Sequence, residues 1–103
     1  MEQNKYLFKL IKDNKWNEFI EYLKDKEDID VNIRDNIDNY LINYAIISNN
    51  KDAVSILIHR GSRLDITDSD GRSILFNPIK YNFIKILQLF SYLTSIKVLS
   101  LHY

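Results

Sequence analysis

The fold is decided by the stretch VNIRDNID, residues 31–38, and by a later stretch of the same pattern, LDITDSDG, residues 64–71. Asp35 in the first stretch and Asp68 in the second are 33 positions apart. A fixed period of about 20 to 50 residues is the sequence signature of a repeat architecture. We therefore expect each stretch to form the same loop of a repeated unit.

The apolar residues that follow each stretch keep the same offset. Ile42 corresponds to Leu75, and Ile46 corresponds to Ile79. Further pairs with this offset are Val54 with Leu87, Ile56 with Leu89 and Leu57 with Phe90. If one extra loop residue is allowed, an earlier copy places Phe19, Ile20, Tyr22 and Leu23 under Ala53, Val54, Ile56 and Leu57. The pattern predicts one domain, residues 1–103, with units at about 4–34, 35–67 and 68–97 and an irregular C-terminal tail at 91–103.

The middle unit contains two helical stripes. Ile42, Ala45 and Ile46 recur at the i, i+3 and i+4 spacing of one helix face, which predicts a short helix over residues 41–48. Asn49 and the asparagine after it should end that helix, and a second stripe predicts a helix over residues 51–60. Gly61 is the expected helix stop. The Asp70–Gly71 pair predicts a tight turn at the tip of a projecting, hairpin-like loop.

Helix, tight turn, helix and projecting loop, repeated every 33 residues, resemble the ankyrin repeat. The segment Asp30-Val31-Asn32 copies the end of an ankyrin unit. The middle unit matches the family pattern at Asp35, Asp38, Tyr40, Leu41, Ile42, Asn43, Ala45, Ile46, Asn49, Asn50, Ile56, Leu57, Gly61, Ser62, Leu64 and Asp65. The last unit matches it at Asp68, Gly71, Ser73, Ile74, Leu75, Phe76, Pro78, Ile79 and Asn82. The resemblance implies an all-α helical solenoid of about three ankyrin-type repeats with short hairpin-like loops, similar to the degenerate ankyrin proteins of large DNA viruses.

Two departures from the family pattern affect helix starts. Neither unit keeps the family's Thr-Pro-Leu-His motif, so the capping hydroxyl survives only at Ser73. Pro78 falls inside the first helix of the last unit, where proline is tolerated only in the first turn. We expect that helix to start late or to kink.

The composition excludes several classes of function. Fourteen basic and fourteen acidic side chains cancel, so a nucleic-acid partner is not expected. The chain has no cysteine, and residues 1–11 lack the apolar core of a signal peptide, which favours an intracellular protein, in the host cytoplasm if the source is viral. The apolar stretch 84–101 carries too many polar residues to span a membrane. No membrane partner is expected.

The candidate chemical groups favour structural roles over catalysis. His59 lies at an expected helix end, His102 lies near the chain end, and Glu18 and Glu21 lie on a solvated helix face. A calcium loop starting at Asp68 would need glycine and glutamate where Ser73 and Ile79 stand. We therefore expect the loop aspartates to form turn hydrogen bonds, and we expect no catalytic residue, metal site or cofactor.

The resemblance also implies a protein partner and the positions that contact it. These positions are Asn36, Ile37, Asn39, Ile47 and Ser48 in the middle unit and Ser69, Asp70, Arg72, Lys80 and Tyr81 in the last unit. Ile37, Ile47 and Tyr81 are apolar or aromatic where water is expected, which is typical of interface anchors. Packing within a degenerate repeat would explain them equally well.

One alternative remains open on the sequence alone. The chain could be a truncated structural remnant with no dedicated partner, or one that self-associates through its apolar tail at residues 90–103. In that tail the family pattern is lost after Phe90. Either the last helix is extended and folds back as a cap, or the end of the array is left exposed.

Overall fold

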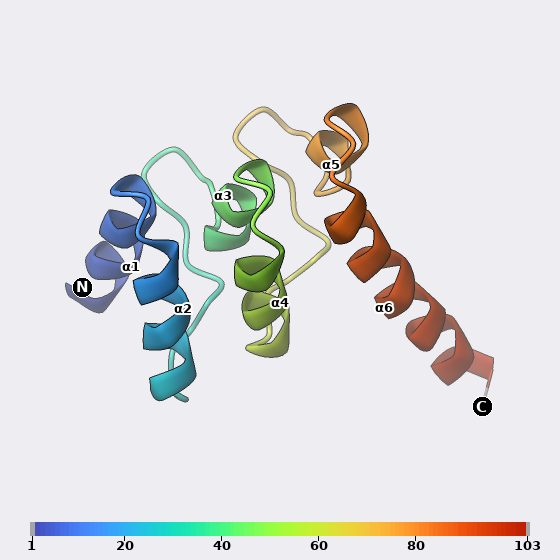
Figure 1. Cartoon of the computed structure of the whole chain (residues 1–103), viewed down its shortest axis with the longest axis horizontal. Coiled ribbons are helices and arrows are strands. Elements are labelled where there is room, and N and C mark those ends of the chain that lie inside the picture. Colours follow the sequence, from blue (N-terminus) through green and yellow to red (C-terminus); the bar gives the residue numbers. More distant parts are fainter. Residues whose placement is uncertain (1, 103) are drawn as a thin grey trace.

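The computed structural model describes the backbone of residues 2–102 and the side chains of residues 3–93. Three helix pairs stand side by side and are joined by two long loops (Figure 1). They are α1 (Glu2–Lys12) with α2 (Trp16–Asp25), α3 (Leu41–Ile47) with α4 (Lys51–His59), and α5 (Phe76–Lys80) with α6 (Ile84–His102). The predicted all-α repeat fold is confirmed. In the described backbone, the extended segments form only the isolated bridges Arg34–Tyr40 and Thr67–Ser73.

The turn inside each helix pair is built in the same way three times. Its left-handed residue is an asparagine in every pair: Asn14 (φ 57°), Asn49 (φ 53°) and Asn82 (φ 58°). The next residue donates its N–H to the carbonyl five positions back: Lys15 to Leu10 at 2.8 Å, Asn50 to Ala45 at 3.0 Å, and Phe83 to Pro78 at 2.9 Å. This is the hydrogen bond of a left-handed helix end. The predicted break at Asn49 is therefore correct, and it recurs in all three units.

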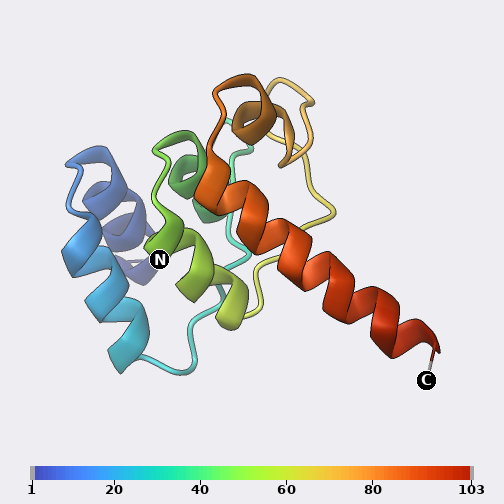
Figure 2. The same ribbon diagram turned by 45° about the vertical axis from the view of Figure 1, so that its right-hand side comes forward.

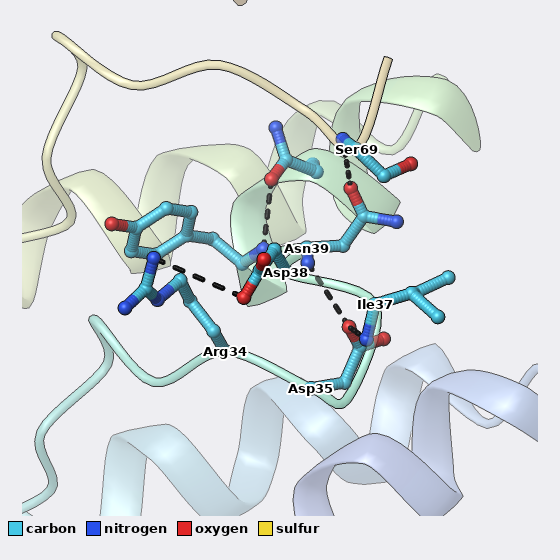
Figure 3. Close-up of polar contacts among 8 residues, drawn as sticks. Arg34, Asp35, Ile37, Asp38, Asn39 and Ser69 are labelled. Carbon is cyan, nitrogen blue, oxygen red and sulfur yellow. Dashed lines mark hydrogen bonds and ion pairs between the residues drawn. The ribbon is translucent and has the colours of Figure 1, made fainter. Parts of the chain in front are cut away.

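The two long loops each end in a finger, defined here as residues 34–40 and 67–73. The Asp35 carboxylate accepts the backbone N–H groups of Ile37 and Asn39 at 3.1 and 3.0 Å (Figure 3). One period later, the Asp68 carboxylate accepts those of Asp70 and Arg72 at 2.9 and 3.0 Å. The predicted side-chain to backbone turn bonds are confirmed at Asp68, and Asp35 forms the same bonds. Asp65 and Asp70 contact the guanidinium groups of Arg63 and Arg72.

The core runs through all three helix pairs. It contains Leu7, Phe19 and Leu23 from the first pair and Leu41, Ile42, Ala45, Ile46, Ala53, Val54 and Leu57 from the middle pair, with Ile86 and Phe90 from the last. The outer helices α2, α4 and α6 contact one another in order, as do the inner helices α1, α3 and α5. Each pair therefore covers an apolar face of its neighbour, as expected for a solenoid.

Helix starts follow the departures noted in the sequence. At α3 the Asn43 side chain accepts the Tyr40 N–H at 2.8 Å, which is the half of a capping box that the third helical residue supplies. Helix α5 begins at Phe76, so Pro78 stands at its third residue, inside the first turn, where the proline nitrogen would have no helical partner in any case. The predicted late start of this helix is confirmed.

The C-terminal tail is helical, which contradicts the expected irregular segment and agrees with the alternative of an extended last helix. Helix α6 continues to His102 and covers residues 91–102, whereas α4 ends at His59. Gly61, with φ 96°, follows the end of α4 in the left-handed conformation that stops a helix. Thr94 stands one period later, and a β-branched residue does not readily adopt that conformation. The side chains of residues 94–103 lie outside the described residues, and with them the question of a cap.

Candidate protein-interaction surface

The predicted contact residues lie on the fingers and on the ends of the inner helices. Both fingers project on the same side of the row, near the turns that end α3 and α5 (Figure 1). Nine of the ten predicted side chains are exposed: Asn36, Ile37, Ile47, Ser48, Ser69, Asp70, Arg72, Lys80 and Tyr81. The structure thus brings these nine to one side of the array.

Asn39 is the exception and is corrected here. Its side chain is buried, and its Oδ1 accepts the backbone N–H of Ser69 at 2.8 Å (Figure 3). Its amide nitrogen lies 3.4 Å from the Tyr44 hydroxyl. Asn39 ties the first finger to the second across 30 residues of sequence and is not available to a partner.

The first finger is also anchored to helix α3. The Tyr44 hydroxyl donates a hydrogen bond to the second carboxylate oxygen of Asp35. Burial, followed by the hydrogen bond with Asp35, raises the pKa of Tyr44 above its ordinary value of 10.0. The Phe8 ring of α1 meets the Tyr44 ring edge to face, with centroids 6.2 Å apart. The finger is therefore held by Tyr44 of α3, whose ring is in turn packed against Phe8 of α1.

The last unit presents a cluster of aromatic rings and cations. The Arg72 guanidinium lies 4.5 Å from the centre of the Phe76 ring, and the Lys80 ammonium lies 5.7 Å from it. Lys80 also lies 5.3 Å from the centre of the exposed Tyr81 ring, which stacks on Phe83. Cations over aromatic faces contribute about 0.5–1 kcal/mol each at exposed sites. These contacts orient Arg72, Lys80 and Tyr81 together.

A cleft in the first unit was missed by the sequence reasoning. It has a volume of ≈ 670 Å³ and lies between α1 and the first finger, lined by Asn4, Lys5, Phe8, Lys9, Lys12, Asp13, Arg34, Asp35 and Asn36. Lys12 and Asp13 precede Asn14 as Ile47 and Ser48 precede Asn49, so they hold the equivalent positions. The shared asparagine turn would have revealed them, but Asn14 precedes Asn49 by 35 residues, two more than the repeat period, whereas the sequence alignment allowed one extra residue.

The charges on the inner helices are of one sign. Among the described side chains of α1, α3 and α5, every charged residue is a lysine: Lys5, Lys9, Lys12 and Lys80. Lys9 forms an exposed ion pair with Asp13 at 2.8 Å, which raises the pKa of Lys9 and lowers that of Asp13, chiefly through their hydrogen bond. The carboxylates on this side come from Asp13 and from the finger aspartates, so the inner side carries charges of both signs.

Neither a metal-binding cluster nor a membrane-spanning helix is present among the described residues. No group of three or more His, Cys, Asp or Glu side chains among them is placed to hold a metal ion. None of the helices, as far as their residues are described, is long and apolar enough to cross a membrane. His59 lies in the last turn of α4, where the helix dipole favours a positive charge.

Comparison with known proteins identifies the type of repeat. The chain is 43% identical over 83 residues to an ankyrin repeat protein of Acanthamoeba polyphaga mimivirus, and this match covers 79% of the chain. The chain is an ankyrin-repeat protein. Its match spans 11% of the mimivirus protein's length, so it corresponds to a small part of that relative. No solved structure matches the ankyrin chain with statistical significance.

A second comparison falls on the first part of the ankyrin chain. Residues 2–66 match the family model described as RNase LS, bacterial toxin, and over this stretch the chain belongs to that sequence family as well. The same residues form α1 to α4 and the first finger. The ribonuclease activity in that description is a property of the named toxin. The three asparagine turns and the two matching fingers are ankyrin features of this chain.

Proposed function

We propose that this ankyrin protein is a non-catalytic interaction module that binds a partner protein through its finger tips and inner helices. The observation that carries the proposal is the exposure of Ile37, Ile47 and Tyr81 on one side of the array. Large apolar groups clustered with polar neighbours are the usual anchors of protein interfaces. The finger tips Asn36, Ser69 and Asp70 and the helix-end residue Ser48 supply those neighbours.

The surface is preorganised, which supports a binding role. Asn39 joins the two fingers, and Tyr44 fixes the first finger to α3 through Asp35. A binding loop that is already ordered loses less entropy when its partner arrives. The fingers thus present their exposed side chains in a fixed arrangement.

We extend the proposed surface to the cleft beside α1. Phe8 is half-buried there and offers apolar surface, while Lys5, Lys9 and Lys12 surround it. Arg72 and Lys80 add positive charge at the other end of the surface. Asp13, Asp35 and Asp70 lie beside these cations, so we expect the partner to meet the surface with side chains of both charges.

The experiment is affinity capture of the partner with matched variants. Tyr81→Ala and Ile47→Asp should abolish or strongly reduce capture of the same protein. Tyr92→Ala and Ile84→Asp change the same residue types at equally exposed positions on the outer helix α6 and should leave capture intact. Equal capture by all four variants, or no partner at all, would contradict the proposal and favour a structural remnant.

We also propose that the array has no catalytic activity of its own, despite the toxin description of the family matched by residues 2–66. The first units use their side chains in turns, caps and the core, as described above. Incubation with RNA should give no turnover. Cleavage that a single point substitution abolishes would overturn this part of the proposal.

The unit limits 4–34, 35–67 and 68–97 remain our proposed division of the array. We also propose an intracellular location, which is the host cytoplasm if the source is viral. The relative from a mimivirus is consistent with that location.

A further inference from the structure

The middle and last units differ in burial at two equivalent positions. Ile42 and Ile46 in α3 are 1% and 2% exposed. One period later, Leu75 is 42% exposed, and Ile79 in α5 is 65% exposed. The middle residues are buried because the last helix pair packs beside them, as the contact of α3 with α5 shows. The last unit therefore presents the face on which another helix pair would pack.

A cleft continues this exposed face. It has a volume of ≈ 380 Å³ and is lined by Leu64, Asp65, Ser73, Ile74, Leu75, Phe90 and Leu93. We call the apolar residues of this region the end face: Leu64, Ile74, Leu75, Ile79, Phe90 and Leu93. The charged member of the cleft, Asp65, is bound by the Arg63 guanidinium at 3.0 and 3.2 Å. The cleft thus adds no uncompensated charge to the apolar end face.

The opposite end of the row is closed. The Tyr6 and Tyr22 rings pack together there with centroids 5.0 Å apart. Gln3 donates a hydrogen bond to the Tyr22 hydroxyl at 3.5 Å, and the Lys26 ammonium lies 5.9 Å from the centre of the Tyr22 ring. Docking another array on this end would bury an amide, two hydroxyls and an ammonium. The two ends are therefore not complementary, and Figure 2 shows them at opposite sides of the row.

We propose that the end face is a self-association surface, on which two copies of this chain pair about a twofold axis and cover each other's Leu75 and Ile79. In such a pairing each surface meets itself, so a charged face would repel its copy while an apolar, charge-compensated face attracts it. The pairing covers the apolar face on which a further helix pair would pack. It places the contact on α5 and the first part of α6, whereas the sequence alone suggested residues 90–103.

The test is the molar mass of the full chain by size-exclusion chromatography with light scattering over a dilution series. The wild-type chain should be dimeric at high concentration and dissociate on dilution. Leu75→Lys combined with Ile79→Lys should be monomeric throughout, and Ile79→Lys alone should weaken the dimer by about tenfold or more. Ile37→Lys makes the same change at a 57% exposed position on the first finger and should leave the dimer unchanged.

Several outcomes would overturn the proposal. They are a wild-type chain that is monomeric at every concentration, a dimer that survives both lysine substitutions, and assembly beyond the dimer. Circular dichroism checks that each variant keeps its helices, and the single Ile79→Lys variant serves if the double variant unfolds. Because the chain has no cysteine, Ile79→Cys with a bismaleimide cross-linker gives a second readout. It should give covalent dimers, and Ile37→Cys should not.

This inference stands apart from the proposed function. The end face shares no residue with the finger tips or with the ends of α3 and α5 that are proposed to bind the partner. Tyr81→Ala should therefore abolish partner capture without changing the molar mass, and the lysine pair should do the reverse. Failure of one proposal can be told from failure of the other.

Discussion

The middle and last units of the array have the same loop and turn conformations but different neighbours. Both have an aspartate-centred finger and an asparagine helix turn, with matching hydrogen bonds 33 residues apart. Ile42 is nevertheless buried while Leu75 is exposed, because the middle unit has a neighbour on each side. Local sequence thus determines the shape of a unit, and the adjoining units determine how much of its apolar surface is removed from water.

The largest expected effect is at Ile42 and Leu75, an equivalent pair that differs in burial. Ile42→Ala should lower the free energy of unfolding by about 2–5 kcal/mol, because it leaves a cavity between two helix pairs. Leu75→Ala, at the equivalent and exposed position, should cost about 1 kcal/mol or less. Urea unfolding of both variants, followed by circular dichroism at protein concentrations below the dimer range, measures the two values. Equal losses would contradict the stacking argument.

The second effect concerns the link between the fingers. Asn39→Ala should cost about 1–3 kcal/mol, because the Ser69 N–H and the Tyr44 hydroxyl lose a partner that burial prevents water from fully replacing. Arg72 holds the equivalent position in the last unit and is exposed. Arg72→Ala removes only exposed contacts with Phe76 and Asp70 and should therefore cost about 1 kcal/mol or less. The same unfolding series compares them, and a costly Arg72→Ala beside a neutral Asn39→Ala would refute the link.

The third effect concerns the left-handed residues of the two finger turns. Asp38 and Gly71 hold equivalent places with φ of 65° and 76°. Asp38→Gly should be neutral or should stabilise by up to about 1 kcal/mol, and Gly71→Ala should destabilise by a similar amount, since only glycine adopts positive φ at little cost. Space is not limiting at Gly71, where a Cβ would meet no atom within 4 Å. Thermal unfolding of the two variants gives the sign, and a stabilising Gly71→Ala would show that the turn is not held in this conformation.

The smallest effect is a dependence on alkaline pH at Tyr44 of the middle unit. The folded state raises the pKa of Tyr44 above 10.0, first through burial and then through the Asp35 hydrogen bond. The resulting stability is fully present below the unfolded pKa of about 10 and is lost as the pH rises through the folded value. Asn77 stands at the equivalent position in the last unit and does not titrate.

The measurement is the unfolding midpoint from pH 8 to pH 11 for the wild-type chain and for Tyr44→Phe. The wild-type midpoint should fall more steeply above pH 10 than that of the variant, because phenylalanine removes the titrating group. Parallel curves would show that the hydroxyl of Tyr44 makes no pH-dependent contribution.

Much of the fold could be predicted from the sequence because helix ends are encoded locally. The predicted helices 41–48 and 51–60 agree with α3 and α4 to within one residue at each end, since Asn49 and Gly61 adopt left-handed conformations at the ends of those helices. Pro78 predicted the late start of α5 for an equally local reason. The length of α6 was also encoded, in Thr94 at the place of Gly61, but the loss of the repeat pattern suggested irregular structure instead.

The surface was harder to predict because it depends on contacts between units. Family positions correctly indicated nine exposed residues, but they could not show that the amide of Asn39 reaches Ser69. The cleft around Phe8 was missed because the helix turn of the first unit is two residues out of register with the 33-residue period. The exposure of Ile79 depends on whether another helix pair packs beside it. The 33-residue period alone does not determine this.

Native-state hydrogen exchange of the backbone amides, followed by NMR, tests most directly whether the units cover one another. At concentrations where dilution no longer changes the molar mass, the amides of α3 and α4 should be the most protected in the chain, and those of α5 the least protected among the inner helices. Equal protection in the middle and last units, or stronger protection in α5 than in α3, would contradict the account.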